Sequence, residues 1–475
     1  MKEKLLREIC VSRKGMEGHM ELGILTLLPP LVILVIAIKS RSTSSSLFIG
    51  AIVCCILQYK TGFLAGLIDL MYAVACDEDT AWYVLFVALF GCLIGIWTRT
   101  GATRALADCL QKYATTKKRT LVLTWLIGLV LFIDDFTSIA VRGTMTKLYD
   151  KNKIPRTQLS YMTDATASPL NALIPIGTWG IFYISVFNGY EEITQYGTGM
   201  GLYAKLIPFL FYSWVAVIIA LLFAIGVIKP FGAMKKAVIT AEETGRLYSD
   251  ASGTLNAADE TDNTPIEAGK MKKLLVGLFG PLLIFIITVI ITGDVITGSL
   301  IAIAVALVLF LAMRLATWKK LMEACMGGIG DMLSMIVIVF CAYMVRDSLI
   351  GVGLPEYVTS VMEPFMSPVI LPVLTFLICA FLAFVSGTNW GSGLPVAAIV
   401  IPLCTAIGGN MFLVISAVVS GAAFGAHACF YCDVTVFTSG MTKIDNMEHA
   451  TTQLPLCLVG GGITAMLYLA AGFIF

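Results

Sequence analysis

The sequence predicts an all-α polytopic membrane protein made of two inverted repeats, each with a re-entrant hairpin and a broken transmembrane helix. Three observations carry this prediction. Hydrophobic residues make up 58% of the 475 residues and charged residues only 13%, a composition typical of integral membrane proteins. Uncharged apolar runs of membrane-spanning length recur along the chain. In each half, polar residues interrupt two of these runs in the same order, and prolines accompany them in the first half.

The N-terminal polar segment, residues 1–21, precedes the first apolar run, Leu22 to Ile38. This run has no small-residue cleavage site, so we expect a first membrane helix rather than a cleaved signal. The basic residues before it conflict with the positive-inside rule, and Met20 stands directly before the run. Whether Met1 or Met20 is the natural start stays open.

The first transmembrane half, residues 22–231, contains two adjacent carboxylates, Asp134 and Asp135, after an uncharged run. An ionisable group inside a bilayer costs at least about 3 kcal/mol and indicates a functional site. Basic residues flank both ends of 120–147, so the chain returns to the side it left. We therefore expect a re-entrant hairpin over 120–147, with the carboxylates at its tip. Arg142 either neutralises one of them or guides a substrate carboxylate.

A broken helix is predicted over 160–187, where polar residues and two prolines, Pro169 and Pro175, interrupt an otherwise membrane-spanning run. Proline removes a backbone donor and disfavours helix at the preceding residue, so carbonyls near this point are freed to face a ligand. Asp164 lies just before the break. Its alternative role is a helix cap.

The long hydrophilic stretch 232–271 predicts a mobile cytoplasmic linker to the second half, residues 272–475. That half repeats the plan, with a hairpin over 366–407 and a broken helix over 412–439, and the last span is expected over 454–475. The basic residues give the two halves opposite orientation. This order is the pattern of a secondary transporter whose site lies at the membrane midplane.

Carboxylate, hydroxyl, amide and imidazole groups near these interruptions are the candidate ion- or substrate-binding residues. A buried carboxylate holds a proton tightly, and a neighbouring cation displaces that proton, so one site can exchange the two. We expect no catalytic residue and no cofactor. The candidates are Asp134, Asp135, Thr137, Asp164, Ser168, Asn171, Thr388, Asn389, His427, Asp433 and Thr435.

Two other site types have partial sequence support. His427, Cys429, Cys432 and Asp433 have types and spacing that suit a soft metal ion. The run Gly328-Ile329-Gly330-Asp331, with Tyr149-Asp150, matches the two half-motifs of an intramembrane aspartyl protease.

Four blocks carry a resemblance to the NhaC-type Na⁺/H⁺ antiporter family, within the ion-transporter superfamily. They are 134–137, 164–169, 386–391, and 420–435 followed by Gln453-Leu454-Pro455. The resemblance implies a multi-pass cell-membrane carrier, not an enzyme, that exchanges Na⁺ for H⁺ by alternating access and forms a homodimer. Its partners would be these ions and the lipid bilayer, with no nucleic acid. Some relatives exchange small carboxylates instead.

One block departs from the family pattern. The family usually reads Gly-Asp-His-Cys-Ser-Pro-Ile-Ser-Asp-Thr-Thr, whereas residues 425–435 read Gly-Ala-His-Ala-Cys-Phe-Tyr-Cys-Asp-Val-Thr. The break thereby loses small polar ligands. The aromatic residues Phe430, Tyr431, Trp390 and Trp179 would instead suit an organic cation. H⁺- or Na⁺-coupled exchange of an amino acid or carboxylate is therefore the alternative function.

Overall fold

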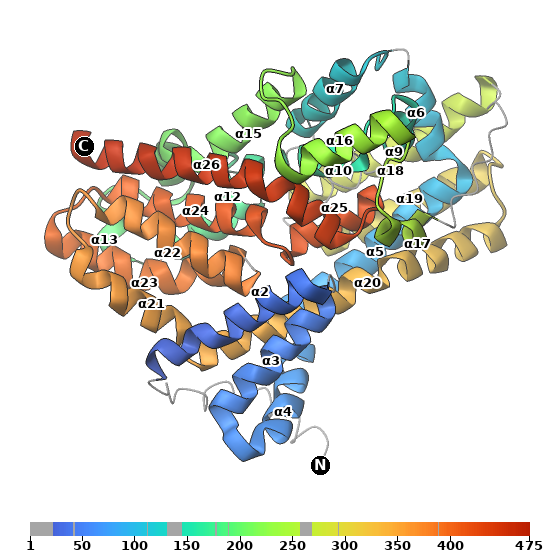
Figure 1. The fold of residues 1–475 in the computed structure, drawn as a ribbon. Helices are drawn as coiled ribbons and strands as arrows, with labels where there is room; N and C mark the ends of the chain where they lie inside the picture. The colour runs from blue at the N-terminus through green and yellow to red at the C-terminus, as the bar shows by residue number, and fades with distance from the viewer. Residues whose placement is uncertain are drawn as a thin grey trace.

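The computed structural model describes residues 22–40, 43–111, 113–130, 145–175, 178–188, 190–256, 268–292, 294–387 and 389–475. Within these ranges every regular element is a helix, so the all-α prediction is confirmed (Figure 1). The candidates Asp134, Asp135, Thr137 and Thr388, together with Arg142 and the segment 1–21, lie outside the described residues.

In the described part, seven helices are long and apolar enough to cross a membrane, or up to eight if one bent pair counts as a single span. The bent pair joins Gly199–Phe209 to Phe211–Ala224 at an angle of 55°. The chain is therefore a multi-pass membrane protein. The seven spans are Ser44–Ala75, Thr80–Thr100, Gly269–Val289, Val295–Ala312, Trp318–Gly351, Met411–Thr442 and Asn446–Ile474.

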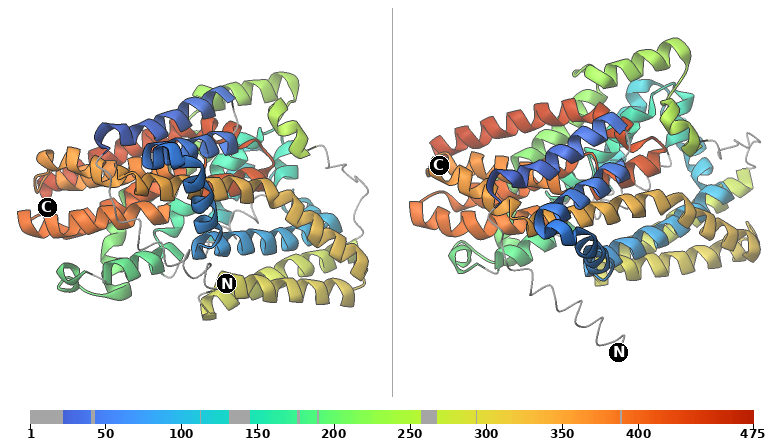
Figure 2. Two further views of the ribbon diagram at one scale, coloured as in Figure 1. Left: turned by 90° about the horizontal axis from the view of Figure 1, so that it is seen from below. Right: turned by 60° about the horizontal axis from the view of Figure 1, so that its bottom comes forward.

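One group of helices packs around α5 (Glu78–Thr100) and α20 (Trp318–Gly351), which run side by side (Figure 2). Glycines let their backbones touch: a Cβ at Gly328 would lie 2.0 Å from the carbonyl oxygen of Gly91, and a Cβ at Gly95 2.2 Å from that of Ala324. Small residues at such a seam let membrane helices approach closely. The other helices of this group are α2 (Leu28–Ser40), α3 (Thr43–Tyr59), α4 (Phe63–Ala75), α6 (Ala102–Gln111), α18 (Ala268–Thr292) and α19 (Val295–Ala312).

A second group contains the C-terminal helices and has its own glycine seam. A Cβ at Gly421 would lie 2.6 Å from the Phe376 carbonyl oxygen, and one at Gly425 would lie 2.5 Å from that of Ala380. The helices of this group are α15 (Phe211–Ala224), α22 (Leu371–Ser386), α23 (Asn389–Ile407), α24 (Met411–Ala428), α25 (Asp433–Thr442) and α26 (Asn446–Ile474).

The chain breaks its helices at two places, one beside this second group and one within it. The first break follows α10 (Arg156–Asp164), continues through the four-residue α11 (Ser168–Asn171) and ends where α12 (Thr178–Asn188) begins. The second separates α24 from α25, where Cys429 and Cys432 have extended backbone angles. Both breaks occur within the stretches 160–187 and 412–439, where prolines or the loss of helical geometry free backbone groups.

The described flanks of the first predicted hairpin lie against one another. Tyr149, on α9 (Thr146–Lys151), donates its hydroxyl proton to Thr124 Oγ1 on α7 (Lys117–Val130) at 2.8 Å. Asn152 Nδ2 donates to Thr120 Oγ1 at 3.0 Å. The chain therefore leaves along α7 and returns beside it.

Part of the predicted linker is folded onto the helices. It forms α16 (Gly232–Thr244), and the segment 246–252 then contacts both α10 and α26. The hydroxyl of Ser249 and the hydroxyl of Ser252 donate to Glu448 Oε2, the first at 2.6 Å. Arg156 N donates to Leu247 O at 3.0 Å. We name residues 246–252 the docked segment.

Two helices begin within polar stretches of the sequence. Helix α20 begins at Trp318, with Thr317 as its N-cap. Helix α26 begins at Asn446 rather than at 454, because the Asp445 carboxylate accepts hydrogen bonds from the backbone N–H groups of Met447 and Glu448. Capping thus extends each helix through polar residues that hydropathy alone assigns to a loop.

The glycine seam between α5 and α20 generates a stability prediction. The substitution Gly328→Ala places a methyl group 2.0 Å from the carbonyl oxygen of Gly91, which is a steric clash. We therefore expect the free energy of unfolding to fall by about 1–3 kcal/mol. The control is Gly330→Ala on the same helix, where nothing lies within 4 Å of the added Cβ. Thermal unfolding in detergent gives the midpoint temperature of each variant. Equal midpoints for the two variants would contradict the close backbone contact proposed at Gly328.

Candidate functional site

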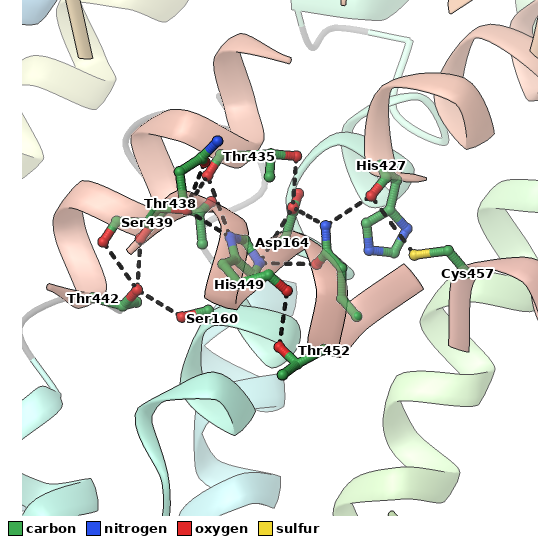
Figure 3. Close-up of polar contacts among 12 residues, drawn as sticks. Ser160, Asp164, His427, Thr435, Thr438, Ser439, Thr442, His449, Thr452 and Cys457 are labelled. Carbon is green, nitrogen blue, oxygen red and sulfur yellow. Dashed lines mark hydrogen bonds and ion pairs between the residues drawn. The ribbon is translucent and has the colours of Figure 1, made fainter. Parts of the chain in front are cut away.

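A buried carboxylate, Asp164, lies at the C-terminal end of α10 and contacts two other helices (Figure 3). Its Oδ2 accepts a hydrogen bond from Thr435 Oγ1 at 3.1 Å and from Gln453 Nε2 at 2.9 Å. His449 Nε2 lies 3.7 Å from the same oxygen. Of the predicted site residues, the structure thus brings Asp164 and Thr435 together, and it joins α10, α25 and α26 at one oxygen atom.

The amide of Gln453 has a defined orientation. Its Nε2 donates to Asp164 Oδ2 and also to the backbone carbonyl of His427, at 2.8 Å. Both partners are acceptors, so the nitrogen must face them and Oε1 must face the other way. Gln453 Oε1 lies 2.9 Å from His449 Nε2, which assigns the hydrogen to that ring nitrogen.

The other ring nitrogen of His449 faces α25. His449 Nδ1 lies 2.9 Å from Ser439 Oγ and 3.3 Å from the carbonyl oxygen of Thr435. The ring is fully buried. With Nε2 as donor, Nδ1 of the neutral ring is an acceptor and lies within hydrogen-bond distance of the Ser439 hydroxyl. That hydroxyl also donates to the Thr435 carbonyl oxygen at 2.8 Å and to Asn446 Oδ1 at 3.0 Å, so three acceptors share its one proton.

His427 contributes its backbone rather than its ring to the contacts around Asp164. Its Nδ1 shares a 2.8 Å hydrogen bond with the hydroxyl of Tyr212 on α15, and its ring stacks on Tyr161 at 6.4 Å between centroids. Nε2 has no hydrogen-bond partner among the described residues. The carbonyl, near the end of α24, accepts from Gln453 Nε2 and from Cys457 Sγ at 3.6 Å.

Asp433 begins α25 and is buried. Its Oδ1 accepts hydrogen bonds from Val434 N at 2.8 Å and from Cys432 Sγ at 3.0 Å. A carboxylate in the first turn of a helix interacts favourably with the helix dipole. Ser168 and Asn171, the predicted ligands within the first break, are buried in the short helix α11.

The aromatic residues at the second break pack against the predicted second hairpin. The Tyr431 hydroxyl donates to Val385 O at 2.5 Å, and a Cβ at Gly387 would lie 2.4 Å from the Tyr431 ring. Gly387 also has a positive φ of 68°, which favours glycine. Phe430 meets Phe384 edge to face at 5.5 Å. These contacts give Phe430 and Tyr431 a packing role at the break.

The structure also describes the residues that the sequence suggested for a metal site and for an aspartyl protease site. No group of three or more His, Cys, Asp or Glu side chains in the described ranges is placed to hold a metal ion. Asp331 pairs with Arg99 at 3.0 Å and Asp150 pairs with Arg156 at 2.6 Å. Each protease-motif aspartate therefore belongs to its own arginine ion pair.

Sequence reasoning missed His449 and Ser439, and it included Gln453 in a motif without placing it in the site. The expected last span began at 454, so the preceding polar run looked like a loop. Two signals were available. His449 is one of only three histidines in the chain, and the four-residue spacing from His449 to Gln453 puts both on one helix face.

Comparisons with known proteins agree with this membrane architecture. The family model described as "Na+/H+ antiporter family" matches residues 183–473. A protein of Haemophilus influenzae described as uncharacterized is 25% identical over 95% of this chain and 91% of its own length. Two further matches each cover about a third of this chain. A malate-2H(+)/Na(+)-lactate antiporter of Bacillus subtilis is 28% identical over 35% of this chain and 36% of its own length. An arginine/ornithine antiporter of Halobacterium salinarum is 24% identical over 33% of this chain and 32% of its own length.

The family match spans more than half of the chain and includes α24, α25 and α26, which supply Thr435, His449 and Gln453. The chain therefore belongs to the Na⁺/H⁺ antiporter family.

Proposed function

We propose that this antiporter exchanges Na⁺ for H⁺ by alternating access and that Asp164 is a carboxylate that binds either ion. The observation that carries the proposal is the placement of Asp164. It is buried at the first helix break and accepts hydrogen bonds from Thr435, just after the second break, and from Gln453. One carboxylate therefore connects the two interrupted regions, where secondary transporters hold their substrates.

The exchange follows from the electrostatics of a buried carboxylate. Removal from water disfavours the charged form, so an empty site holds a proton, whereas an adjacent cation favours the charged form. Na⁺ arriving at Asp164 displaces the proton, and a proton arriving from the other side displaces Na⁺. Thr435 Oγ1 lies within hydrogen-bond distance of this carboxylate and supplies a further hard oxygen for the cation.

The predicted hairpin 120–147 supports the same site. Residues from its described flanks, Leu121 and Tyr149, share a buried apolar cluster with Leu159 and Met162 of α10. The base of the hairpin therefore packs on the helix that ends at Asp164. We propose that Asp134, Asp135 and Thr137 contribute to cation binding from its tip, and that the two halves are inverted repeats. From the family resemblance we also propose that the protein lies in the cell membrane and forms a homodimer.

A second candidate function is coupled exchange of a small organic solute. Two relatives are named as antiporters of malate and lactate and of arginine and ornithine. The second break also carries Cys429, Phe430 and Tyr431, which offer few hard oxygens for Na⁺. In this version Asp164 still binds and releases the coupling H⁺ or Na⁺, and the exchanged solute is an amino acid or carboxylate.

The role of Asp164 is tested in liposomes that contain a trapped pH dye. A Na⁺ pulse should release lumenal protons with the parent protein, and Asp164→Asn should slow this release at least about tenfold, because it removes the exchanging charge. The control, Asp331→Asn, breaks an exposed ion pair with Arg99 and should stay within about twofold of the parent. Proton movement driven by organic solutes but not by Na⁺ would replace the first candidate with the second, and an active Asp164→Asn would contradict both.

Thr435 provides a second test, on cation affinity. Thr435→Val keeps the side-chain shape but removes the hydroxyl that donates to Asp164, so we expect the apparent Na⁺ affinity to fall about tenfold. Thr435→Ser keeps the hydroxyl and should resemble the parent. Equal Na⁺ dependence of the two variants in the liposome assay would show that the hydroxyl is not part of the site.

A further inference from the structure

The contacts around Asp164 form a chain of hydrogen bonds through α26. Ser439 Oγ lies 2.9 Å from His449 Nδ1, His449 Nε2 lies 2.9 Å from Gln453 Oε1, and Gln453 Nε2 lies 2.9 Å from Asp164 Oδ2. All four residues are buried. The chain runs from the Ser439 hydroxyl to the carboxylate. From His449 Nε2 to Asp164 each N–H group has one acceptor, whereas the Ser439 hydroxyl also donates to the Thr435 carbonyl oxygen and to Asn446 Oδ1.

Gln453 is the central residue of this hydrogen-bond chain, because both N–H groups and the carbonyl oxygen of its amide form hydrogen bonds at the same time. One N–H reaches Asp164 at the end of α10, and the other reaches the His427 carbonyl near the end of α24. If the amide rotated by half a turn, its carbonyl oxygen would face two acceptors and repel both. The donor at His449 Nε2 prevents that rotation by holding Oε1.

We infer that Gln453 and His449 are positioning residues that set the balance between proton and cation at Asp164, an inference that rests on the proposed exchange at this carboxylate. Gln453 donates a hydrogen bond that favours the ionised carboxylate. His449 acts through Gln453: its N–H keeps the amide turned toward Asp164, and its own charge does not change. Together they keep the proton affinity of a buried carboxylate low enough for a cation to compete.

Other ionisable groups lie near this carboxylate or near the residues that bind it, so the test must separate their effects from the effect of the amide. His427 and Asp433 come from the two sides of the second break, and Tyr161, Tyr212 and Cys457 come from α10, α15 and α26. None of these side chains changes in the variants below, so their contribution is common to all of them.

The test follows the protonation of Asp164 directly. In vesicles containing the full chain, infrared spectroscopy records the C=O band of protonated carboxyl groups as pH rises, and the band lost in Asp164→Asn is the signal. We expect Gln453→Leu to move the pH midpoint of that band upward, and Gln453→Glu to move it further, by at least about one pH unit, because a donor becomes a like charge. The apparent Na⁺ affinity should fall about tenfold for each pH unit by which the midpoint of the band moves upward.

The matched pair at His449 separates positioning from proton transfer. His449→Gln keeps an N–H donor near the position of Nε2 but cannot titrate in this range, so its midpoint should equal that of the parent. His449→Leu loses the donor and should move the midpoint in the direction of Gln453→Leu. A shift as large in His449→Gln as in His449→Leu would overturn the inference, because the charge of the ring would then matter.

Two further outcomes also overturn the inference. Variants at Gln453 that lower thermal stability but leave the midpoint in place would show a purely structural role. An absence of any Asp164-dependent band would show that this carboxylate does not exchange a proton. The spectroscopic signal does not depend on transport, so midpoints that shift as expected in a protein without Na⁺-driven proton release would refute the Na⁺/H⁺ assignment and leave the positioning role standing.

Discussion

The hydrogen bonds to the buried Asp164 carboxylate are the interaction on which the site depends. A carboxylate at this depth is costly unless other groups compensate it. Here the compensation comes from Thr435 on α25 and Gln453 on α26. These donors belong to helices that are far from α10 in the sequence. The burial of one carboxylate is therefore compensated only when α10, α25 and α26 keep their relative positions.

The helix breaks make such an arrangement possible. A continuous helix satisfies its own backbone and leaves only side chains for a ligand. Where α10 ends at Asp164 and α24 ends at Ala428, backbone groups become available to side chains, as the bond from Gln453 to the His427 carbonyl illustrates. The glycine seams at Gly328 and Gly425 hold neighbouring helices together in the two helix groups. Close packing of the regular helices therefore compensates for the missing helical hydrogen bonds at the breaks.

The sequence predicted the helical class, the two helix breaks and the residues Asp164 and Thr435, because all of these follow from hydropathy, proline chemistry and the cost of buried charge. It did not predict that His449 and Gln453 join the same site. Hydropathy begins the last span after them, whereas the Asp445 cap starts α26 at Asn446. A cap is a local geometric feature that a hydropathy window does not detect. The aromatic residues at 430 and 431 likewise suggested a ligand surface, but their contacts with Phe384 and Val385 depend on tertiary packing.

The docked segment has a mechanical consequence. Its backbone binds Arg156 at the start of α10, and its serines bind Glu448 in the first turn of α26. These are the helices that carry Asp164 and Gln453. A motion that separates the two helices must break these bonds, whereas a motion of both helices together carries the segment with them. The docked segment is thus coupled to the helices that carry Asp164 and Gln453, because these helices cannot separate without breaking its hydrogen bonds.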